Sequence, residues 1–503
     1  MSNLSELIPA GGGQNNTDFV ADGGITSGKP VILTAAGKVT QVGESAGSET
    51  LGSPVDAIGA AAKGYGMSTV YDAASGKMVL VYVLNSDTDV YAVVGTISGT
   101  TISWGTPVTV SGAITADNWP QICYDSDTEQ VIIAYQVQSA QTYVITGKVS
   151  GTTISFGTAV SIDATANAVD FTVSYNTSDG KGLVIYGLPY EGSNAGRAKV
   201  ITVTGTSISL GAVNNWDTGA GGNDDYFSSC YDANAGKIVF AKKDGDNQGR
   251  AAVFTISGTT VSAGTFVNYT DSSNVTNTSI TYDSTAQKVV TATRQTTTTY
   301  GYAAVGTVSG TSISFGTPVA FNSANVVTAT VSCAYGGDSA NVTNILFTPT
   351  TDSFLYYING TVSGTSISFN TAARAYSGAA TSATRSGINS EASGKVLFLI
   401  NPGSTADGLT DNFVYGAVLQ NVATTTNLTA TNLLGIASAA ILDTATGTIN
   451  TWGSRNEVQT SLTIASDYYV QSDGTITTAS ASPAQLIGEA ITATQINIKD
   501  YTG

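Results

Sequence analysis

The chain has 503 residues, 36 acidic and 19 basic side chains, and a formal net charge of −17. Such a field repels phosphate backbones and anionic lipid surfaces, which excludes nucleic-acid and membrane binding through a basic patch. The chain contains no histidine, the side chain most often used for acid and base catalysis near neutral pH and the commonest metal ligand. No apolar run approaches the ~18 residues of a membrane-spanning helix, so no membrane insertion is expected.

Residues 1–48 are predicted to be the first part of a small β domain. The opening segment MSNLSELIPAGGGQNN lacks the basic and apolar regions of a signal peptide, so no export signal is expected. The later segment GITSGKPVILTAAGKVTQVG alternates apolar and polar residues around glycine-containing turns, which favours short strands.

Residues 49–422 carry a repeat with a period of about 53 residues. A hairpin motif, S/T-G-T-x-I/V-S, is centred on Gly99, Gly151, Gly205, Gly258, Gly310 and Gly364. A second motif, Tyr-Asp followed by a turn and an apolar run, starts at Tyr71, Tyr124, Tyr175, Tyr231, Tyr282 and Tyr335, with a degenerate seventh copy at 387–400. Each period reads as four strands, which is typical of a propeller blade. The sequence therefore predicts an all-β chain built around a seven-bladed β-propeller.

The ring is predicted to close by joining distant parts of the chain. The segment LGSPVDAIGA at 51–60 matches WGTPVTVSGA at 104–113, so Gly52 lies one period before Gly105. The segment 51–60 therefore reads as the fourth strand of a blade, but no first three strands precede it. At the C-terminal end of the repeats, the seventh blade has no fourth strand. We expect residues near 51–57 to complete that blade, which removes exposed sheet edges.

Three sets of recurring residues are predicted to be structural. Aromatic residues that follow the hairpin at one offset should pack between blades: Trp104, Phe156, Phe315 and Phe369. Aspartates after the recurring tyrosine should form turns: Asp72, Asp125, Asp232 and Asp283. The cysteines occupy equivalent positions in different blades and should be buried free thiols: Cys123, Cys230 and Cys333.

The connections between strands predict where binding occurs. The first-to-second and third-to-fourth turns are short and repeated, whereas the second-to-third and fourth-to-first loops are long and differ between blades. Function concentrates on loops held by a rigid scaffold, so the long loops form the candidate binding face. Aromatic residues suited to stacking on glycans lie there: Trp119, Tyr190, Trp216, Tyr226 and Tyr300. The chain leaves the seventh blade at a third-to-fourth turn, so the terminal segments should emerge on the short-turn face.

No catalytic residue, metal site or cofactor is predicted. The run DGDNQG at 244–249 lacks the distal glutamate of a calcium loop and favours a plain turn. Arginines are sparse and the hairpin lacks the Asp-box form, which argues against a sialidase, although carboxylate pairs leave a glycan hydrolase or lyase open. No Walker loop, Rossmann fingerprint or nucleophile elbow occurs in a suitable strand-to-helix context.

Residues 423–503 are predicted to complete the domain begun by residues 1–48. Closure of the ring brings both chain ends together, and the segments LTIASDYYVQSDGTITT and LIGEAITATQINIK again read as short strands with glycine-containing turns. The two pieces are expected to form a small β-barrel or sandwich of about 130 residues, into which the propeller is inserted.

The pattern G-x-I-x-x-G-K-P-V-x-L in the front piece, followed in the rear piece by GIA, LTIASDYYV and IGEAITATQINI, resembles terminal domains of tailed-bacteriophage virion proteins, especially fibre-like and decoration proteins of marine phages. The blade unit GTVSGTSISFGTPV is similar to repeats in such proteins. The resemblance implies a non-enzymatic virion surface protein that assembles in the host cytoplasm. Its terminal domain would bind other capsid or tail proteins, and its propeller would display a face for host-surface polysaccharide.

Several alternatives stay open at this stage. A propeller glycan hydrolase or lyase is the chief rival, and a cellular scaffold for protein partners is the third reading. A homo-oligomer is compatible with the sequence. Head or tail location and the identity of the receptor are not predicted.

Overall fold

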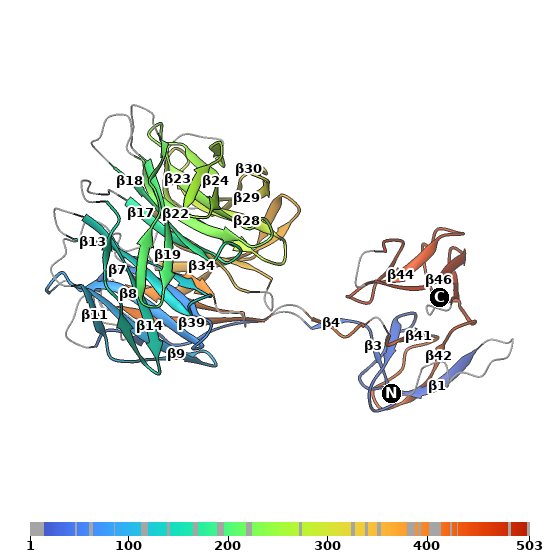
Figure 1. The fold of residues 1–503 in the computed structure, drawn as a ribbon. Helices are drawn as coiled ribbons and strands as arrows, with labels where there is room; N and C mark the ends of the chain where they lie inside the picture. Colours follow the sequence, from blue (N-terminus) through green and yellow to red (C-terminus); the bar gives the residue numbers. More distant parts are fainter. Residues whose placement is uncertain are drawn as a thin grey trace. The chain divides into compact units, whose positions relative to one another are not determined.

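The computed structural model describes residues 15–45, 48–59, 64–84, 86–111, 119–137, 141–163, 168, 170–188, 196–217, 224–270, 274–322, 327–337, 341–349, 354–379, 388–390, 394–401, 414–422, 425–429, 431–480 and 484–499. Within these ranges the regular structure consists of strands, with no α-helix (Figure 1). The chain divides into two compact units, one made of Met1–Ser48 and Ala423–Gly503 and the other of Glu49–Val422.

The larger unit contains seven sheets of one topology in the described part of the chain. Sheet 1 consists of β7 (Gly64–Asp72), β8 (Lys77–Leu84), β9 (Val90–Ser98), β10 (Thr101–Trp104) and β11 (Val108–Ser111). Sheet 2 consists of β12 (Gln121–Asp125), β13 (Gln130–Val137), β14 (Gln141–Ser150), β15 (Thr153–Phe156) and β16 (Val160–Ser161). Sheet 3 consists of β17 (Asp170–Asn176), β18 (Lys181–Gly187), β19 (Gly196–Thr204), β20 (Ser207–Leu210) and β21 (Asn214–Asp217). Sheet 4 consists of β22 (Asp225–Asp232), β23 (Lys237–Lys243), β24 (Gly249–Ser257), β25 (Thr260–Ala263) and β26 (Val267–Asn268).

The remaining three sheets repeat this arrangement. Sheet 5 consists of β27 (Val275–Asp283), β28 (Lys288–Gln295), β29 (Gly301–Ser309), β30 (Ser312–Phe315) and β31 (Val319–Asn322). Sheet 6 consists of β32 (Val327–Tyr335), β33 (Thr343–Pro349), β34 (Phe354–Ser363), β35 (Ser366–Phe369) and β36 (Ala373–Ala379). Sheet 7 consists of β37 (Ile388–Ser390), β38 (Lys395–Ile400), β39 (Tyr415–Val422), β5 (Ser48–Leu51) and β6 (Val55–Asp56).

The sheets form a closed ring. The first strand of each sheet neighbours the first strand of the next, from β7 and β12 round to β32 and β37, and β37 neighbours β7. Sheet 7 takes its fourth strand from the front of the chain, because β5 pairs with β39 and β6 pairs with β39 beyond it. The predicted propeller and its mode of closure are therefore confirmed. The closing strand begins at Ser48 rather than near residue 51.

The fourth strand of each sheet differs from the prediction in one respect. It was expected as a single element, but it is split into two pieces that both pair with the third strand, as β10 and β11 do with β9. The break falls at Gly105, whose amide still donates a hydrogen bond to the carbonyl of Val94 at 2.8 Å. Pro107, two residues on, lacks an N–H for the ladder, so regular pairing resumes only at Val108.

The glycine at this break fits closely against the neighbouring sheet. A Cβ on Gly105 would lie 1.9 Å from the carbonyl oxygen of Thr152, in the hairpin of sheet 2, and a Cβ on Gly52 would lie 1.8 Å from that of Thr100 in sheet 1. The same approach recurs at Gly157, Gly211, Gly264 and Gly316. Direct backbone contact between sheets explains why the motif requires glycine here.

Sheet 6 departs from this rule and carries Asn370 in place of the glycine. The next sheet, sheet 7, has no hairpin between its third and fourth strands, because the smaller unit is inserted there. The Asn370 side chain instead donates a hydrogen bond to Oε1 of Glu49 in β5 at 2.8 Å, and Asn359 donates to the same oxygen at 2.6 Å. The exception in the repeat therefore marks the insertion point.

The recurring side chains have the predicted structural roles. Oδ1 of Asp72 accepts hydrogen bonds from the turn amides of Ala74 and Ser75 at 3.1 and 3.2 Å. Asp125, Asp232 and Asp283 bind turn amides in the same way. The recurring tyrosines add a link between sheets, since the hydroxyl of Tyr124 in sheet 2 accepts a hydrogen bond from the Ala74 amide in sheet 1.

The core lies between the sheets, where the second and third strands are apolar on both faces. Trp104 packs on Gly416 of sheet 7, and Phe369 of sheet 6 contacts Phe321 of sheet 5 with ring centroids 6.0 Å apart, which confirms the predicted packing role of these aromatics. The three cysteines are free thiols; Cys123 and Cys333 are buried and Cys230 is half-buried. Burial raises the pKa of Cys333 to about 12.

The described residues of the smaller unit form two five-stranded sheets and a two-stranded one. The first sheet has the order β1 (Asn16–Val20), β42 (Thr446–Asn450), β41 (Leu433–Ala437), β2 (Pro30–Leu33) and β3 (Val39–Gln41). The second has the order β43 (Arg455–Asn456), β47 (Gln495–Ile498), β46 (Gln485–Thr492), β44 (Asp467–Val470) and β45 (Ile476–Thr477). β4 (Glu44–Ser45) pairs with β40 (Thr425–Thr426). One apolar cluster joins the two large sheets through Ile32, Ile436, Val470 and Ile487, so front and rear segments share a core.

Candidate binding face

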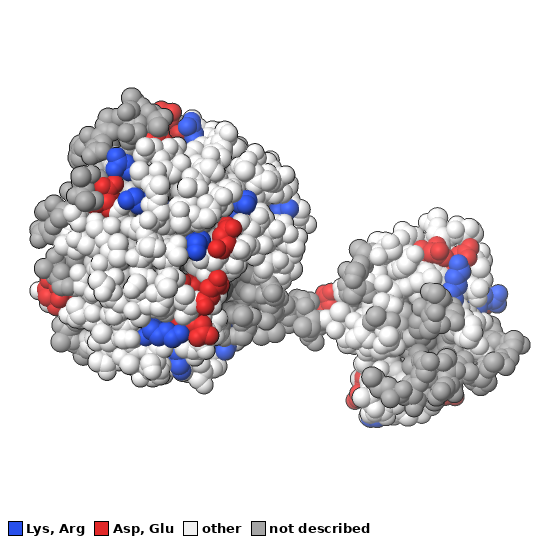
Figure 2. All heavy atoms as spheres, viewed as in Figure 1, with Lys and Arg blue, Asp and Glu red and all other residues white. Residues whose placement is uncertain are grey.

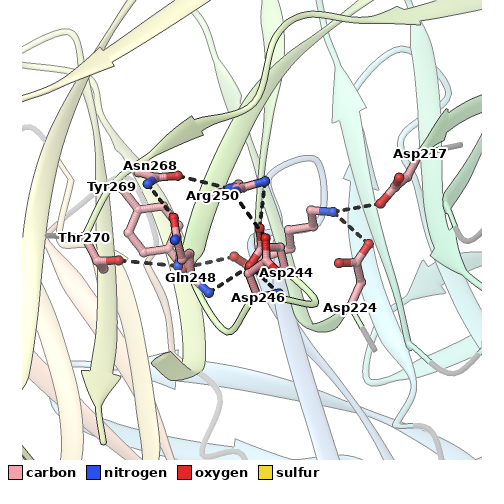
Figure 3. Close-up of polar contacts among 11 residues, drawn as sticks. Asp217, Asp224, Asp244, Asp246, Gln248, Arg250, Asn268, Tyr269 and Thr270 are labelled. Atoms are coloured by element: carbon pink, nitrogen blue, oxygen red, sulfur yellow. Dashed lines mark hydrogen bonds and ion pairs between the residues drawn. The ribbon is translucent and has the colours of Figure 1, made fainter. Parts of the chain in front are cut away.

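The second-to-third connections and the links between consecutive sheets share one end of the ring, and we call this end the loop face. The tight turns, such as the one at Gly99 between β9 and β10, lie at the opposite end. Val422 and Glu49, where the larger unit's chain ends, belong to that turn end. Charged side chains are few on the side of the molecule drawn in Figure 2, and acidic and basic ones lie in mixed groups. Figure 3 shows a polar group on the loop face that belongs to sheet 4 and the end of sheet 3.

The first part of this group is a buried lysine held by two carboxylates. Nζ of Lys242, at the end of β23, lies 2.7 Å from Oδ2 of Asp224 and 3.2 Å from Oδ2 of Asp217. The side chains of Lys242 and Asp224 are 5% and 6% exposed, whereas that of Asp217 is 27% exposed. A buried charge must be paired in this way, because removing one partner leaves the others uncompensated.

Aromatic rings line the other side of the lysine. Its ammonium nitrogen lies 4.8 Å from the ring centroids of both Trp216 and Phe266. Trp216 also contacts Phe240 edge-on at 5.2 Å, in a cluster that includes Phe227 and Phe254. Cation–π attraction in a desolvated site adds to the ion pairs that hold the ammonium group.

The carboxyl of Asp224 responds to this environment. Burial raises its pKa to about 6, Lys242 opposes that rise, and the neighbouring Asp217 adds to it. A carboxylate that lies away from water is disfavoured as an anion unless a cation balances it. Asp224 therefore changes its protonation just below neutral pH.

The second part of the group is a turn locked to an arginine. The carboxylate of Asp244 accepts hydrogen bonds from the amides of Asp246 and Gln248 at 3.1 and 2.8 Å through Oδ1, while Oδ2 lies 2.8 Å from Nη1 of Arg250. Both oxygens are therefore engaged within the protein, in a turn at 244–249. Asn247 takes the left-handed conformation that this tight turn requires, with φ of 64°.

Arg250 also orients exposed side chains through hydrogen bonds. Nε of Arg250 donates to Oδ1 of Asn268 at 3.1 Å, and Nδ2 of Asn268 donates to Oε1 of Gln248 at 2.5 Å. Asn268 and Asp246 are exposed, and the Arg250 side chain is 34% exposed. The surface therefore presents an amide, a carboxylate and a guanidinium in fixed orientations, and such groups can bind ligand hydroxyls without first being ordered.

The five predicted ligand contacts lie in different surroundings. Trp119 packs its indole against Gly66 of the neighbouring first strand, where a Cβ would lie 2.6 Å from its ring. Trp216 is half-buried and lies within the aromatic cluster beside Lys242. Tyr226 has φ of 58° and interacts with Arg294. Burial lowers the pKa of Arg294 below its ordinary value, and Tyr226 opposes part of that change. Tyr300 lies 6.5 Å from Tyr302 between ring centroids, and Tyr190 falls outside the described residues.

The polar group itself was not predicted from the sequence. Lys242, Asp224, Arg250 and Asn268 lie at or beside strand ends, and Arg250 and Asn268 have counterparts in Arg197 and Asn215 of sheet 3. The one available signal was two consecutive lysines, Lys242 and Lys243, at the end of an apolar second strand, where sheet 5 carries the single cation Arg294. Among the described residues, no three His, Cys, Asp or Glu side chains are placed to hold a metal ion. No apolar helix long enough to cross a bilayer occurs in the same ranges.

No protein-family model and no curated protein sequence matches the chain. Solved structures with a similar course of the chain include the PQQ-bound aldose sugar dehydrogenase of Streptomyces coelicolor, at 11% identity and a TM-score of 0.39, covering 62% of this chain and 97% of that one. A variant of the Aleuria aurantia lectin with α-methyl-L-fucoside has 10% identity and a TM-score of 0.40, covering 64% and 98%. The Cps50 (Swd1) β-propeller domain of Myceliophteria thermophila has 8% identity and a TM-score of 0.42, covering 74% and 99%. Likenesses of this size carry no argument about ligand or activity.

Proposed function

We propose that this protein is a non-enzymatic binding protein whose loop face recognises neutral host-surface glycans, and whose smaller unit attaches it to a bacteriophage particle. The observation that carries the binding role is the group formed by Arg250, Asn268 and Gln248. Its side chains are ordered by the buried carboxylate of Asp244 and end at the surface. Fixed amide and guanidinium groups match sugar hydroxyls, which both donate and accept hydrogen bonds.

The attachment role is supported by the distribution of apolar surface. Among the described residues, seven large hydrophobic side chains are exposed, and six of them belong to the smaller unit: Val20, Leu442, Trp452, Val458, Ile464 and Ile491. Exposed apolar side chains gathered on a small domain are typical of a surface that is covered in an assembly. The virion as that assembly is proposed from the phage-like pattern of the terminal segments.

One specific observation favours a rival function as a glycan hydrolase. Asp224 and Asp217 bind the same lysine, and the pKa of Asp224 is raised to about 6, as a general acid requires. However, the Asp224 side chain is 6% exposed and pairs directly with Lys242, so a substrate oxygen has little access to it. We therefore interpret the group as a structural support. Release of reducing ends from polysaccharide by purified protein, lost in Asp224→Asn, would establish the rival.

Asn268→Ala is expected to weaken binding of the full-length protein to host-surface polysaccharide about tenfold, because it removes the acceptor that orients Arg250 and an exposed amide. Binding would be measured by biolayer interferometry on immobilised polysaccharide. Asn215→Ala is the matched control: Asn215 pairs with Arg197 in sheet 3 as Asn268 pairs with Arg250 in sheet 4, and it is also exposed. Equal losses in both variants, or no binding by the wild-type protein, would contradict the proposal.

A further inference from the structure

Sheets 1 and 2 carry the same pair of stacked tyrosines. In sheet 1, Tyr82 of β8 lies opposite Tyr91 of β9, with ring centroids 5.9 Å apart and planes at 19°. In sheet 2, Tyr135 of β13 lies opposite Tyr143 of β14, at 5.9 Å and 18°. In each pair the second-strand ring is buried and the third-strand ring is half-buried. Residues directly opposite in an antiparallel sheet share a face. Each tyrosine pair therefore forms the first two positions of a row of side chains that runs across the sheet to its outer edge, and we call this row the ladder and its positions steps.

Sheet 6 shows how such a ladder can be extended. Phe347 of β33 stacks on Tyr356 of β34 at 6.0 Å and 25°, and Arg374 of β36 lies opposite Tyr356. The guanidinium carbon of Arg374 is 4.3 Å from the Phe354 ring centroid and 5.7 Å from the Tyr356 ring centroid, and Nε donates to the Tyr356 hydroxyl at 2.9 Å. A planar group therefore occupies the third step of the ladder in sheet 6.

In sheets 1 and 2 the residue at the third step of the ladder has a short side chain. The residue opposite Tyr91 on β11 is Thr109, and the residue opposite Tyr143 on β16 is Ser161. Neither side chain is long enough to cover an aromatic ring. Among the described residues, the strand positions opposite Tyr91 and Tyr143 therefore supply no planar group of the kind that Arg374 supplies in sheet 6.

Both tyrosines are also held in place by a polar neighbour. The Tyr91 hydroxyl donates to Oδ2 of Asp87 at 3.0 Å, and the Tyr143 hydroxyl donates to Oε1 of Gln141 at 3.0 Å. Asp87 is exposed and Gln141 is half-buried. Each ring is thus an oriented platform with a hydrogen-bonding group at its edge, and the arrangement occurs twice.

We propose that Tyr91 and Tyr143 form two equivalent stacking sites, each for one pyranose ring of a neutral saccharide. This inference rests on the proposed glycan-binding function and adds to it the place and number of sugar contacts. The C–H face of a pyranose stacks on each tyrosine ring at the register position that Arg374 occupies opposite Tyr356 in sheet 6, and its hydroxyls reach Asp87 or Gln141. The carboxylate of Asp87 and the chain's net charge of −17 select against anionic sugars. Two sites on one chain increase the affinity for a repeating polysaccharide through avidity.

The decisive variant places a long side chain at the third step of the ladder in both sheets. Thr109→Arg combined with Ser161→Arg reproduces the residue that sheet 6 carries at the same register position and places a guanidinium over each tyrosine. With the full-length protein and methyl glucoside, galactoside and mannoside as probes, we expect NMR titration to show binding about tenfold weaker than wild type, while the melting temperature is unchanged. Tyr91→Phe combined with Tyr143→Phe keeps both rings and is expected to retain binding within about threefold.

Other outcomes separate this inference from the proposed function. Wild-type titration curves in the double arginine variant, together with loss of binding in Asn268→Ala, would overturn the two stacking sites and leave glycan recognition at sheet 4 intact. Absence of binding of any pyranoside or host polysaccharide to the wild-type protein would overturn both. Loss in the arginine variant with retention in Asn268→Ala would support the stacking sites and move recognition away from sheet 4.

Discussion

Gly52→Ala is expected to lower the free energy of unfolding by about 3 kcal/mol, which would be among the largest effects of a single added methyl group. The new Cβ would lie 1.8 Å from the carbonyl oxygen of Thr100, and both partners are backbone, so the seventh and first sheets must move apart. That seam is where the front of the chain closes the ring. Urea unfolding followed by tyrosine and tryptophan fluorescence would measure the change.

Asn370→Ala is the matched control for this substitution. Asn370 occupies the equivalent position of sheet 6, where no neighbouring hairpin approaches, so its loss removes the hydrogen bonds to Glu49 and from the Asn359 amide and costs about 1–2 kcal/mol. If Gly52→Ala unfolded at the wild-type urea concentration, the seam described here could not be present in solution. Gly105→Ala should match Gly52→Ala, since its Cβ would meet Thr152 at 1.9 Å.

Lys242→Met is expected to destabilise the larger unit by about 3 kcal/mol at pH 7. The methionine fills the same space against Trp216 and Phe266, but it leaves the carboxylates of Asp224 and Asp217 together without a cation. Lys243→Met is the matched control, because Lys243 pairs at 3.4 Å with Asp225, whose side chain is 42% exposed, and such pairs contribute less than about 1 kcal/mol. Thermal unfolding of both variants would give the comparison.

The pH dependence of Lys242→Met provides a second check. Asp224 has a folded-state pKa of about 6, above its ordinary value of 3.8, so its ionisation costs stability as pH rises between these values. Lys242 lowers that pKa, so removing the lysine moves the pKa higher and lets Asp224 hold its proton near neutral pH. The destabilisation should therefore shrink as pH falls from 8 to 5. A deficit that is constant across this range would show that Asp224 does not sense Lys242.

The sequence by itself determined the propeller, because its signals are local and repeated. Each Tyr-Asp turn and each S-G-T hairpin fixes the direction of the next strand within a few residues, and the period then sets the number of strands per sheet. The one-period offset between Gly52 and Gly105 was enough to place the closing strand, since both glycines meet the same feature of a neighbouring sheet. Asn370 as the mark of the insertion point became clear only once that contact was seen.

Only the tertiary structure decided which side chains act together on the loop face. Lys242 meets Asp217 and Asp224 from different sheets or strand ends, and no spacing in the sequence distinguishes that group from solvated charges. Trp216 has polar neighbours in sequence, yet it is half-buried and contacts the rings of Phe240 and Phe254 from other strands. The stacking sites depend on strand register, which sets Thr109 beside Tyr91 but Arg374 beside Tyr356. Local sequence encodes strands and turns, whereas a site is made by contacts between strands, whose register and neighbours are settled by packing of the whole ring.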